Sequence, residues 1–475
     1  NFYLVYSGLV TFNPAMELQP DLARSWEVNQ DGSEYIFHLD PDAVFHNGRP
    51  VTAEDVVYSW ERAAAPETGS ETVLTYLGDI QGVRAKREGR ADRISGLQVI
   101  DDHTLQVTLE QPVPYFLLKL TYPTGFVVDN QNVEQGGDWY RAPNGTGPYR
   151  LSRWTSRKEI LYERFDAYHG EKPAIKAILI VMYQGTGLQL YELGATDMAG
   201  VAYSDLIRFT DPSDPMHNEL QSSLNMCTRY VTMDVNQPPF DDTKVRQAFA
   251  MSVDKERYVR VITEGGAIAA KGLYPPALPG YDKNSKGLEF NPEKARLLLK
   301  ESKYGKGELP EILFSLPNYG SYVSESVSSI VQMWEENLGI KIIVQNIDPE
   351  NYQDALDDGR HGQLISEGWC ADYPDPENFA DVLFHSGSDM NRSNYANPEL
   401  DRLLEEARVE EDIVRRMEMY RQAEEIIVND APAVFWTHSK TYTLVKPYLK
   451  GYVGTPIGIP LERYLWIDSD MFFGD

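Results

Sequence analysis

The sequence predicts a mixed α/β protein whose lobes are joined by several short crossings, which is a hinge architecture. The chain has 475 residues, enough for about two to four domains. Strand-like and helix-like apolar patterns alternate along it. No Gly/Ser-rich linker, low-complexity tract or internal repeat separates it into independent modules.

The N-terminal part is predicted to mix strands with helices. Residues 35–39 alternate apolar and polar side chains, as a half-buried strand does. Thr52 can cap a helix whose third position, Asp55, completes a capping box. Residues 97–100 and 104–109 flank a polar turn and predict a hairpin. Further strands are expected at 159–164 and 177–182, and a loop at 143–148.

The region from Cys227 onward predicts a partly parallel α/β domain, because strands and helices alternate there. Expected strands are 229–235, 312–316 and 340–345. Expected helices are 242–252, one capped by Asp254, one opened by Pro292, 321–338, 399–408 and 414–428. The C-terminal end returns to strand and loop.

Charge excludes two classes of partner. The chain carries 72 acidic and 44 basic residues, a net charge of −28. Such a surface repels nucleic acid and anionic lipid, so we expect no nucleic-acid partner. No apolar run approaches the roughly 18 residues of a membrane helix. Many Tyr and Trp side chains suit a wet binding cleft, although stacking in ordinary strands accounts for most of them.

Motifs of catalysis are absent from the sequence. It contains no His-Glu-x-x-His, no P-loop and no Gly-x-Ser-x-Gly, so we expect no enzyme activity, no catalytic residue, no metal and no cofactor. The two cysteines, Cys227 and Cys370, are too few for a Cys₄ zinc site. They form either two buried thiols or one disulfide, and composition alone favours the thiols.

Six segments carry a family resemblance. They are LQPDLARSWEV (18–28), DGSEYIFHL (31–39), FHNGRPVTAEDVVYSW (45–60), NGTGPY (144–149), NQPPFDD (236–242) and VRQA (245–248). In this order they resemble the solute-binding proteins of the peptide/nickel family, which feed ABC importers, and the resemblance covers essentially the whole chain. It implies an α/β, two-lobed periplasmic-binding-protein fold of type II, in the large cluster with an extra domain. The ligand cleft would lie between lobes joined by hinge crossings.

The resemblance also implies domain boundaries. Lobe I would be discontinuous, with an extra domain associated with it, and lobe II would be a single stretch. The expected ranges are 1–10, 137–226 and 438–475 for lobe I, 11–136 for the extra domain, and 227–437 for lobe II.

A narrower match concerns residues 368–373, Gly-Trp-Cys-Ala-Asp-Tyr, which resemble the signature of oligopeptide-binding proteins. The segment at Cys227 resembles the one that carries the other half of that subgroup's disulfide. The segments at 444–448 and 451–452 fit its C-terminal region. The resemblance therefore implies a Cys227–Cys370 bridge, which reverses the reading from composition alone.

The same resemblance implies roles for single residues. Asp372 would pair with the α-ammonium of a bound peptide, whereas alone it would be read as a turn or helix cap before Pro374. Gly368 and Cys370 would offer backbone groups, and Trp369 would either wall the cleft or pack in the core. The predicted ligand-binding set is Gly368, Trp369, Cys370, Ala371, Asp372 and Tyr373.

Two departures from the family leave ligand length open. The stretch 364–367 lacks the cation that receives a peptide carboxylate in well-known members. Tyr322 or Val323 stands where a His would serve the same purpose. The nearest cations are Arg360 and His361, and we expect them to lie at a solvent-exposed helix end instead. A family segment with a peptide-pairing strand would precede Asn1, so we expect an incomplete cleft.

The expected function is to bind di- to oligopeptides by hinge closure and deliver them to an ABC permease. We expect a monomer in the periplasm or at the outer face of the cytoplasmic membrane, with a lipoprotein anchor as one option and no signal sequence in this chain. The alternative is a binding protein of the same fold for oligosaccharides, nickel chelates or another small solute. A sensor or chaperone role would use the same fold.

Overall fold

The computed structural model describes residues 2–182, 185–307, 309–317, 323–459 and 461–472. The chain divides into two units. Unit 1 comprises Asn1–Gly200, Asn218–Gln221 and Thr443–Asp475, and unit 2 comprises Val201–His217 and Ser222–Tyr442. The chain therefore passes from one unit to the other after Gly200, His217, Gln221 and Tyr442. The finer division of unit 1 into a lobe and an extra domain stays a prediction.

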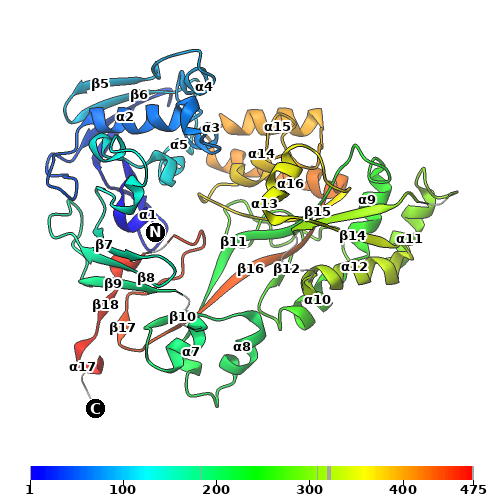
Figure 1. Ribbon diagram of the computed structural model, residues 1–475. Coiled ribbons are helices and arrows are strands. Elements are labelled where there is room, and N and C mark those ends of the chain that lie inside the picture. The colour runs from blue at the N-terminus through cyan, green and yellow to red at the C-terminus, as the bar shows by residue number, and fades with distance from the viewer. Residues whose placement is uncertain (1, 183–184, 308, 318–322, 460, 473–475) are drawn as a thin grey trace. The chain divides into compact units, whose positions relative to one another are not determined.

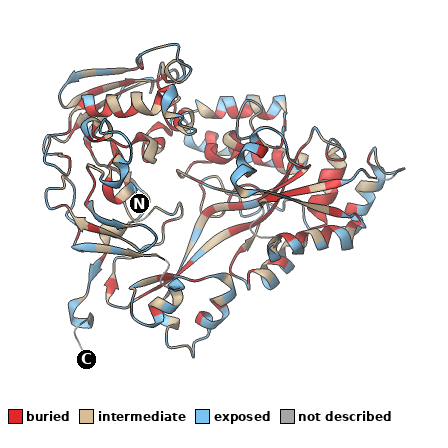
Figure 2. Cartoon of the chain, viewed as in Figure 1, coloured by how far each residue is buried: buried red, intermediate tan, exposed pale blue. Residues whose placement is uncertain are grey.

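A four-stranded antiparallel sheet forms one part of unit 1, in the order β3 (Ala23–Val28), β4 (Glu34–Leu39), β6 (Thr104–Thr108), β5 (Leu97–Asp101). The predicted hairpin is thus confirmed. Helix α2 (Ala53–Ala64) begins after Thr52, whose N–H donates to the Asp55 carboxylate at 2.9 Å, as expected of the capping box. Most residues of α2 are buried or half-buried (Figure 2). Trp60 on this helix is fully buried.

The remaining strands of unit 1 form small antiparallel sheets. Their bounds are β1 (Val10–Phe12) with β2 (Leu18–Pro20), β7 (Tyr149–Thr155) with β8 (Glu159–Arg164) and β9 (Ala177–Val181), and β17 (Leu449–Lys450) with β18 (Trp466–Ile467). Its short helices are α1 (Phe2–Val5), α3 (Val73–Tyr76), α4 (Val83–Arg87), α5 (Phe116–Lys119), α6 (Asn130–Val133), α7 (Gly187–Glu192) and α17 (Ser469–Phe472).

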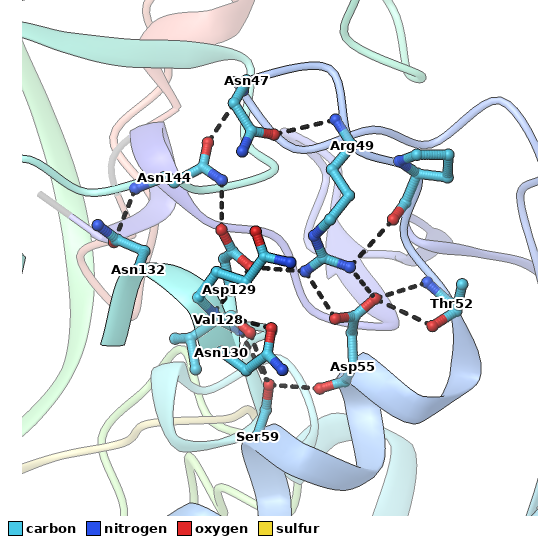
Figure 3. A network of polar contacts seen from close by, with 12 residues as sticks. Asn47, Arg49, Thr52, Asp55, Ser59, Val128, Asp129, Asn130, Asn132 and Asn144 are labelled. Atoms are coloured by element: carbon cyan, nitrogen blue, oxygen red, sulfur yellow. Dashed lines mark hydrogen bonds and ion pairs between the residues drawn. The ribbon is translucent and has the colours of Figure 1, made fainter. Parts of the chain in front are cut away.

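Polar contacts tie two of the family-like segments together (Figure 3). Arg49 Nη2 donates to Asp55 at 2.7 Å and to Asp129 at 2.6 Å. Asp129 also accepts from Asn144 Nδ2 at 2.6 Å, and Asn144 Oδ1 accepts from the Asn47 N–H at 2.9 Å. The Asn-Gly-Arg and Asn-Gly-Thr-Gly motifs therefore build the fold of unit 1.

Two glycines of the second motif are needed for close packing. A Cβ added to Gly145 would lie 1.9 Å from the Val5 carbonyl oxygen, and one on Gly147 would lie 2.6 Å from that of Leu4. Only glycine allows the loop to approach the N-terminal backbone this closely.

Unit 2 is built on a mixed sheet in the order β16 (Ala433–Val445), β11 (Leu220–Met233), β15 (Leu364–Cys370), β13 (Ile312–Pro317), β14 (Ile342–Ile347). Strand β13 is parallel to both neighbours, whereas β11 and β15 are antiparallel. The predicted partly parallel domain is confirmed. Two short strands, β12 (Ile268–Ala269) and β10 (Met198–Gly200), also pair with β16.

Helices cover both faces of this sheet, with α10, α11 and α12 on one side and α14 and α15 on the other (Figure 1). The helices of unit 2 are α8 (Tyr203–Thr210), α9 (Thr243–Met251), α10 (Lys255–Ile262), α11 (Pro292–Glu301), α12 (Glu325–Leu338), α13 (Pro349–Asp357), α14 (Glu377–Phe384), α15 (Pro398–Arg408) and α16 (Ile413–Asp430). Asp254 caps α10 as predicted. Trp334 anchors the core, and its Nε1 donates to the Phe249 carbonyl at 3.1 Å.

Some boundaries differ from the predictions. The predicted helix start at Ser321 lies outside the described residues, and α12 begins at Glu325 behind an N-cap, Ser324. Gly339 ends this helix in the left-handed conformation (φ 71°), so the next strand starts at Ile342 rather than at residue 340. No helix among the described residues is long and apolar enough to cross a membrane.

Candidate functional site

The motif 368–373 begins within strand β15 and continues past its end at Cys370. Its register against β11 places Cys227 opposite Cys370 and Arg229 opposite Gly368. The two cysteines form a disulfide, with their Cα atoms 4.0 Å apart. The bridge implied by the resemblance is present, and it fastens the start of the motif to β11.

Backbone groups of the motif face away from β11. The Ala371 N–H donates to the Met226 carbonyl, so these two residues form a hydrogen-bonded pair. Hydrogen-bonded and non-hydrogen-bonded pairs alternate along an antiparallel ladder, so Cys370 and Gly368 each belong to a non-hydrogen-bonded pair. The N–H and C=O groups of these two residues therefore point away from β11. On that outer side β13 pairs only with Leu364 and Ile365 among the described residues. Within the described part of the chain, the Gly368 and Cys370 backbone is therefore a strand edge of the kind that an extended ligand can join.

Asn378, buried on α14, positions the rest of the motif. Its Oδ1 accepts from the Asp372 N–H at 3.0 Å and from Trp369 Nε1 at 3.3 Å. Asp372 and Trp369 are both half-buried, which leaves each a face toward solvent. The start of α14 is served by another acid, since Asp375 accepts from the Glu377 N–H at 2.9 Å. Asp372 is therefore not the N-cap of α14, whose N-cap position is held by Pro376.

A buried polar layer lies beneath the motif. Arg416 donates to both oxygens of Asp375 at 2.7 and 2.8 Å, and both side chains are buried. The Tyr373 hydroxyl donates to Glu377. Burial, and then the Glu377 charge, hold the pKa of Tyr373 well above its usual value, so it remains a phenol. These contacts fix the loop that carries Asp372.

The predicted ligand-binding residues fall into three groups. Gly368 and Cys370 are exposed, and Trp369 and Asp372 are half-buried. Ala371 and Tyr373 have buried side chains, which support the loop from below. The six residues form one continuous segment. Within it, Gly368 and the disulfide-bonded Cys370 are the residues most exposed to solvent.

The cations weighed from the sequence have local roles. Arg360 donates to Asp358 at 2.8 and 3.2 Å on an exposed turn after α13, and His361 Nδ1 lies 2.7 Å from the Gly362 carbonyl. This agrees with the solvated helix end expected for them. Tyr322 lies outside the described residues, and Val323 is half-buried.

Arg229 is the residue that sequence reasoning missed. It is exposed, and its side chain lies across Gly368: a Cβ added there would be 2.8 Å from Arg229 Cδ and 2.9 Å from Nη1. The only signal in the sequence is that Arg229 is the one charged residue of strand β11. Its meaning depends on the register with β15, which a sequence does not show.

Comparison with known proteins places this geometry in a family. Residues 17–391 match the family described as bacterial extracellular solute-binding proteins, family 5 Middle. The chain belongs to the family 5 extracellular solute-binding proteins. The match covers most of the chain and both units.

Individual members of family 5 agree along nearly the full length. The periplasmic oligopeptide-binding protein OppA of Escherichia coli is 30% identical, over 98% of this chain and 87% of its own. The probable deoxycholate-binding periplasmic protein YgiS of Escherichia coli is also 30% identical, over 94% and 85%. The structure of Haemophilus influenzae OppA in complex with RPPGFSPFR matches with a TM-score of 0.81 and 26% identity, over 98% of this chain and 93% of that one. The expected type II periplasmic-binding-protein fold is confirmed.

Proposed function

We propose that this protein binds peptides and delivers them to an ABC import permease. The observation that carries the proposal is the outward-facing backbone of Gly368 and Cys370, followed by the half-buried Asp372 carboxylate. An extended peptide can add to this edge through main-chain hydrogen bonds, which do not depend on its side chains. Its α-ammonium then meets Asp372. One relative is named as an oligopeptide-binding protein, and the structure of another is a complex with the nine-residue peptide RPPGFSPFR, which supports the same class.

The setting of the proposed function follows from the same relatives. Their names place them in the periplasm, so we infer that this chain works there or at the outer face of the cytoplasmic membrane. It would act as a monomer, with the ligand shifting it to the conformation that the permease recognises.

The test is a thermal-shift panel on the whole chain, because a ligand that binds only the native state raises the melting temperature. The panel holds di- to pentapeptides, their N-acetylated forms, cello- and xylo-oligosaccharides, and deoxycholate. We expect the free-amine peptides to stabilise the protein. Stabilisation by sugars or by deoxycholate, with no response to any peptide, would show that the ligand class is wrong.

The same panel, followed by calorimetry, tests Asp372. We expect Asp372→Asn to weaken free-amine peptides by about 10- to 100-fold, since a hydrogen bond to a charged group contributes about 1.5–3 kcal/mol. N-acetylated peptides, which carry no ammonium, should lose little. Asp389→Asn removes an exposed carboxylate elsewhere in unit 2 and should change neither. Equal losses for both peptide forms would contradict the ammonium contact.

A further inference from the structure

We propose that Arg229 binds the terminal carboxylate of the ligand, so that unit 2 selects short peptides with both ends free. This inference rests on the proposed function and adds the group that reads the second end. It assigns the role to a residue on β11, the strand next to the motif.

The Arg229 side chain is exposed on β11. It makes no hydrogen bond or ion pair to another described residue, although the chain has 72 acidic residues against 44 basic ones. Arg392, which also lies in unit 2, shows the contrast: it donates to Glu367 at 2.9 Å and lies 3.6 Å from Asp357. Arg229 is thus a guanidinium whose planar fork is available for a carboxylate.

The Arg229 side chain lies on the same face of the sheet as Gly368. Cys227, Arg229, Gly368 and Cys370 share one face of the β11–β15 ladder, because side chains alternate along each strand. The Arg229 side chain runs across Gly368, where any larger residue would displace it. Burial raises the pKa of Tyr203 and of Tyr258, and the positive charge of Arg229 partly opposes this rise. The cation therefore sits directly over the backbone that the ligand is proposed to join.

The distance from Gly368 to Asp372 limits the length of the ligand. The two residues are four positions apart, which is at most about 13 Å at about 3.3 Å per extended residue. An extended ligand with its ammonium at Asp372 and its carboxylate over Gly368 therefore has about two to four residues. It would run antiparallel to β15, as the outward-facing pairs at Gly368 and Cys370 allow.

The experiment is calorimetry on the full chain with the tripeptide Ala-Phe-Ala and its C-terminal amide. We expect the wild type to prefer the acid by about 10- to 100-fold. Arg229→Met should bind the acid as weakly as the wild type binds the amide, with little change for the amide itself. Arg229→Lys should keep part of the preference. Arg360→Met removes an exposed cation that already pairs with Asp358, and should behave as the wild type.

The outcomes separate this inference from the proposed function. If the wild type binds acid and amide equally, or if Arg229→Met keeps the preference, Arg229 does not bind the carboxylate although peptides still bind. If hexapeptides bind as tightly as tripeptides, the length limit is wrong. If no peptide binds in either form, the proposed function itself fails. Melting temperatures of the exposed-site variants check that each is folded.

Discussion

At the scale of single residues, a buried acid makes the stability of unit 2 depend on pH. Glu424 lies on α16, and its Oε1 accepts from the Tyr274 N–H at 2.8 Å. Burial disfavours the charged carboxylate and raises the pKa of Glu424 from 4.5 to about 7, although the backbone hydrogen bonds oppose this. Between these two values the folded state binds more protons than the unfolded state. The free energy of unfolding therefore falls as pH rises from about 4.5 through about 7.

We expect Glu424→Gln to remove this decline, because the amide cannot ionise and keeps an oxygen for the Tyr274 N–H. A shift of this size corresponds to about 3 kcal/mol, so the variant should be more stable than the wild type at pH 8 by up to that amount. Urea unfolding at pH 5 and pH 8 measures it. Glu425→Gln, an exposed neighbour on the same helix, should follow the wild type. Parallel pH profiles for wild type and Glu424→Gln would contradict the assignment.

At the scale of elements, α16 holds the loop after β15, which we propose binds the ligand, through an ion pair. Arg416 is 1% exposed and holds Asp375, two residues before α14. We expect Arg416→Met to lower the free energy of unfolding by about 3–5 kcal/mol, because it leaves Asp375 buried and unpaired. It should also weaken peptide binding, since the same loop carries Asp372. Urea unfolding and calorimetry measure the two effects.

The neighbouring arginine is the matched control for this prediction. Arg415 pairs with Glu410 at 3.0 Å, but its side chain is 72% exposed. Arg415→Met should therefore cost less than about 1 kcal/mol. If the two variants were equally stable, the buried pair would not be what fixes the loop.

The elements also show what sequence patterns can predict. Four helices were predictable because each follows a capping residue and has an apolar face: α2, α10, α11 and α15. Helix α14 was missed because the polar residues Glu377, Asn378 and Asp381 are buried in it, each through polar contacts with residues outside the helix. Patterns of apolar and polar residues fail where burial depends on such pairing. Helix α13 was missed although Asp348 and a following proline mark its start.

The candidate site was predictable only in part, for a related reason. The motif 368–373 could be predicted from resemblance because its residues are contiguous in the sequence. The disulfide could be predicted because the chain has one other cysteine that can pair with Cys370. Arg229 belongs to the site only because β11 and β15, 139 residues apart at this pair, are in one register. Long-range register is fixed by packing of the whole sheet and is not written in either strand alone.

At the scale of the whole molecule, the disulfide closes a long stretch of chain. Cys227 and Cys370 are 143 residues apart, and that span contains most of the helices and strands of unit 2. A cross-link over such a span restricts the unfolded chain, which in the chain-entropy account contributes about 5 kcal/mol. The bond thus stabilises unit 2 as a whole while fastening the motif to β11.

We expect the double variant Cys227→Ala/Cys370→Ala to fold with the same β11–β15 register, because the ladder continues through Met233 and Leu364. Its free energy of unfolding should be lower by up to about 5 kcal/mol, measured in urea without reductant. Reduction of the wild type should produce a similar loss, whereas reductant should leave the double variant unchanged. Hydrogen exchange on the backbone amides of β15 would show whether the register persists. An unchanged urea midpoint would mean that packing of the sheet, rather than the cross-link, determines the stability of unit 2.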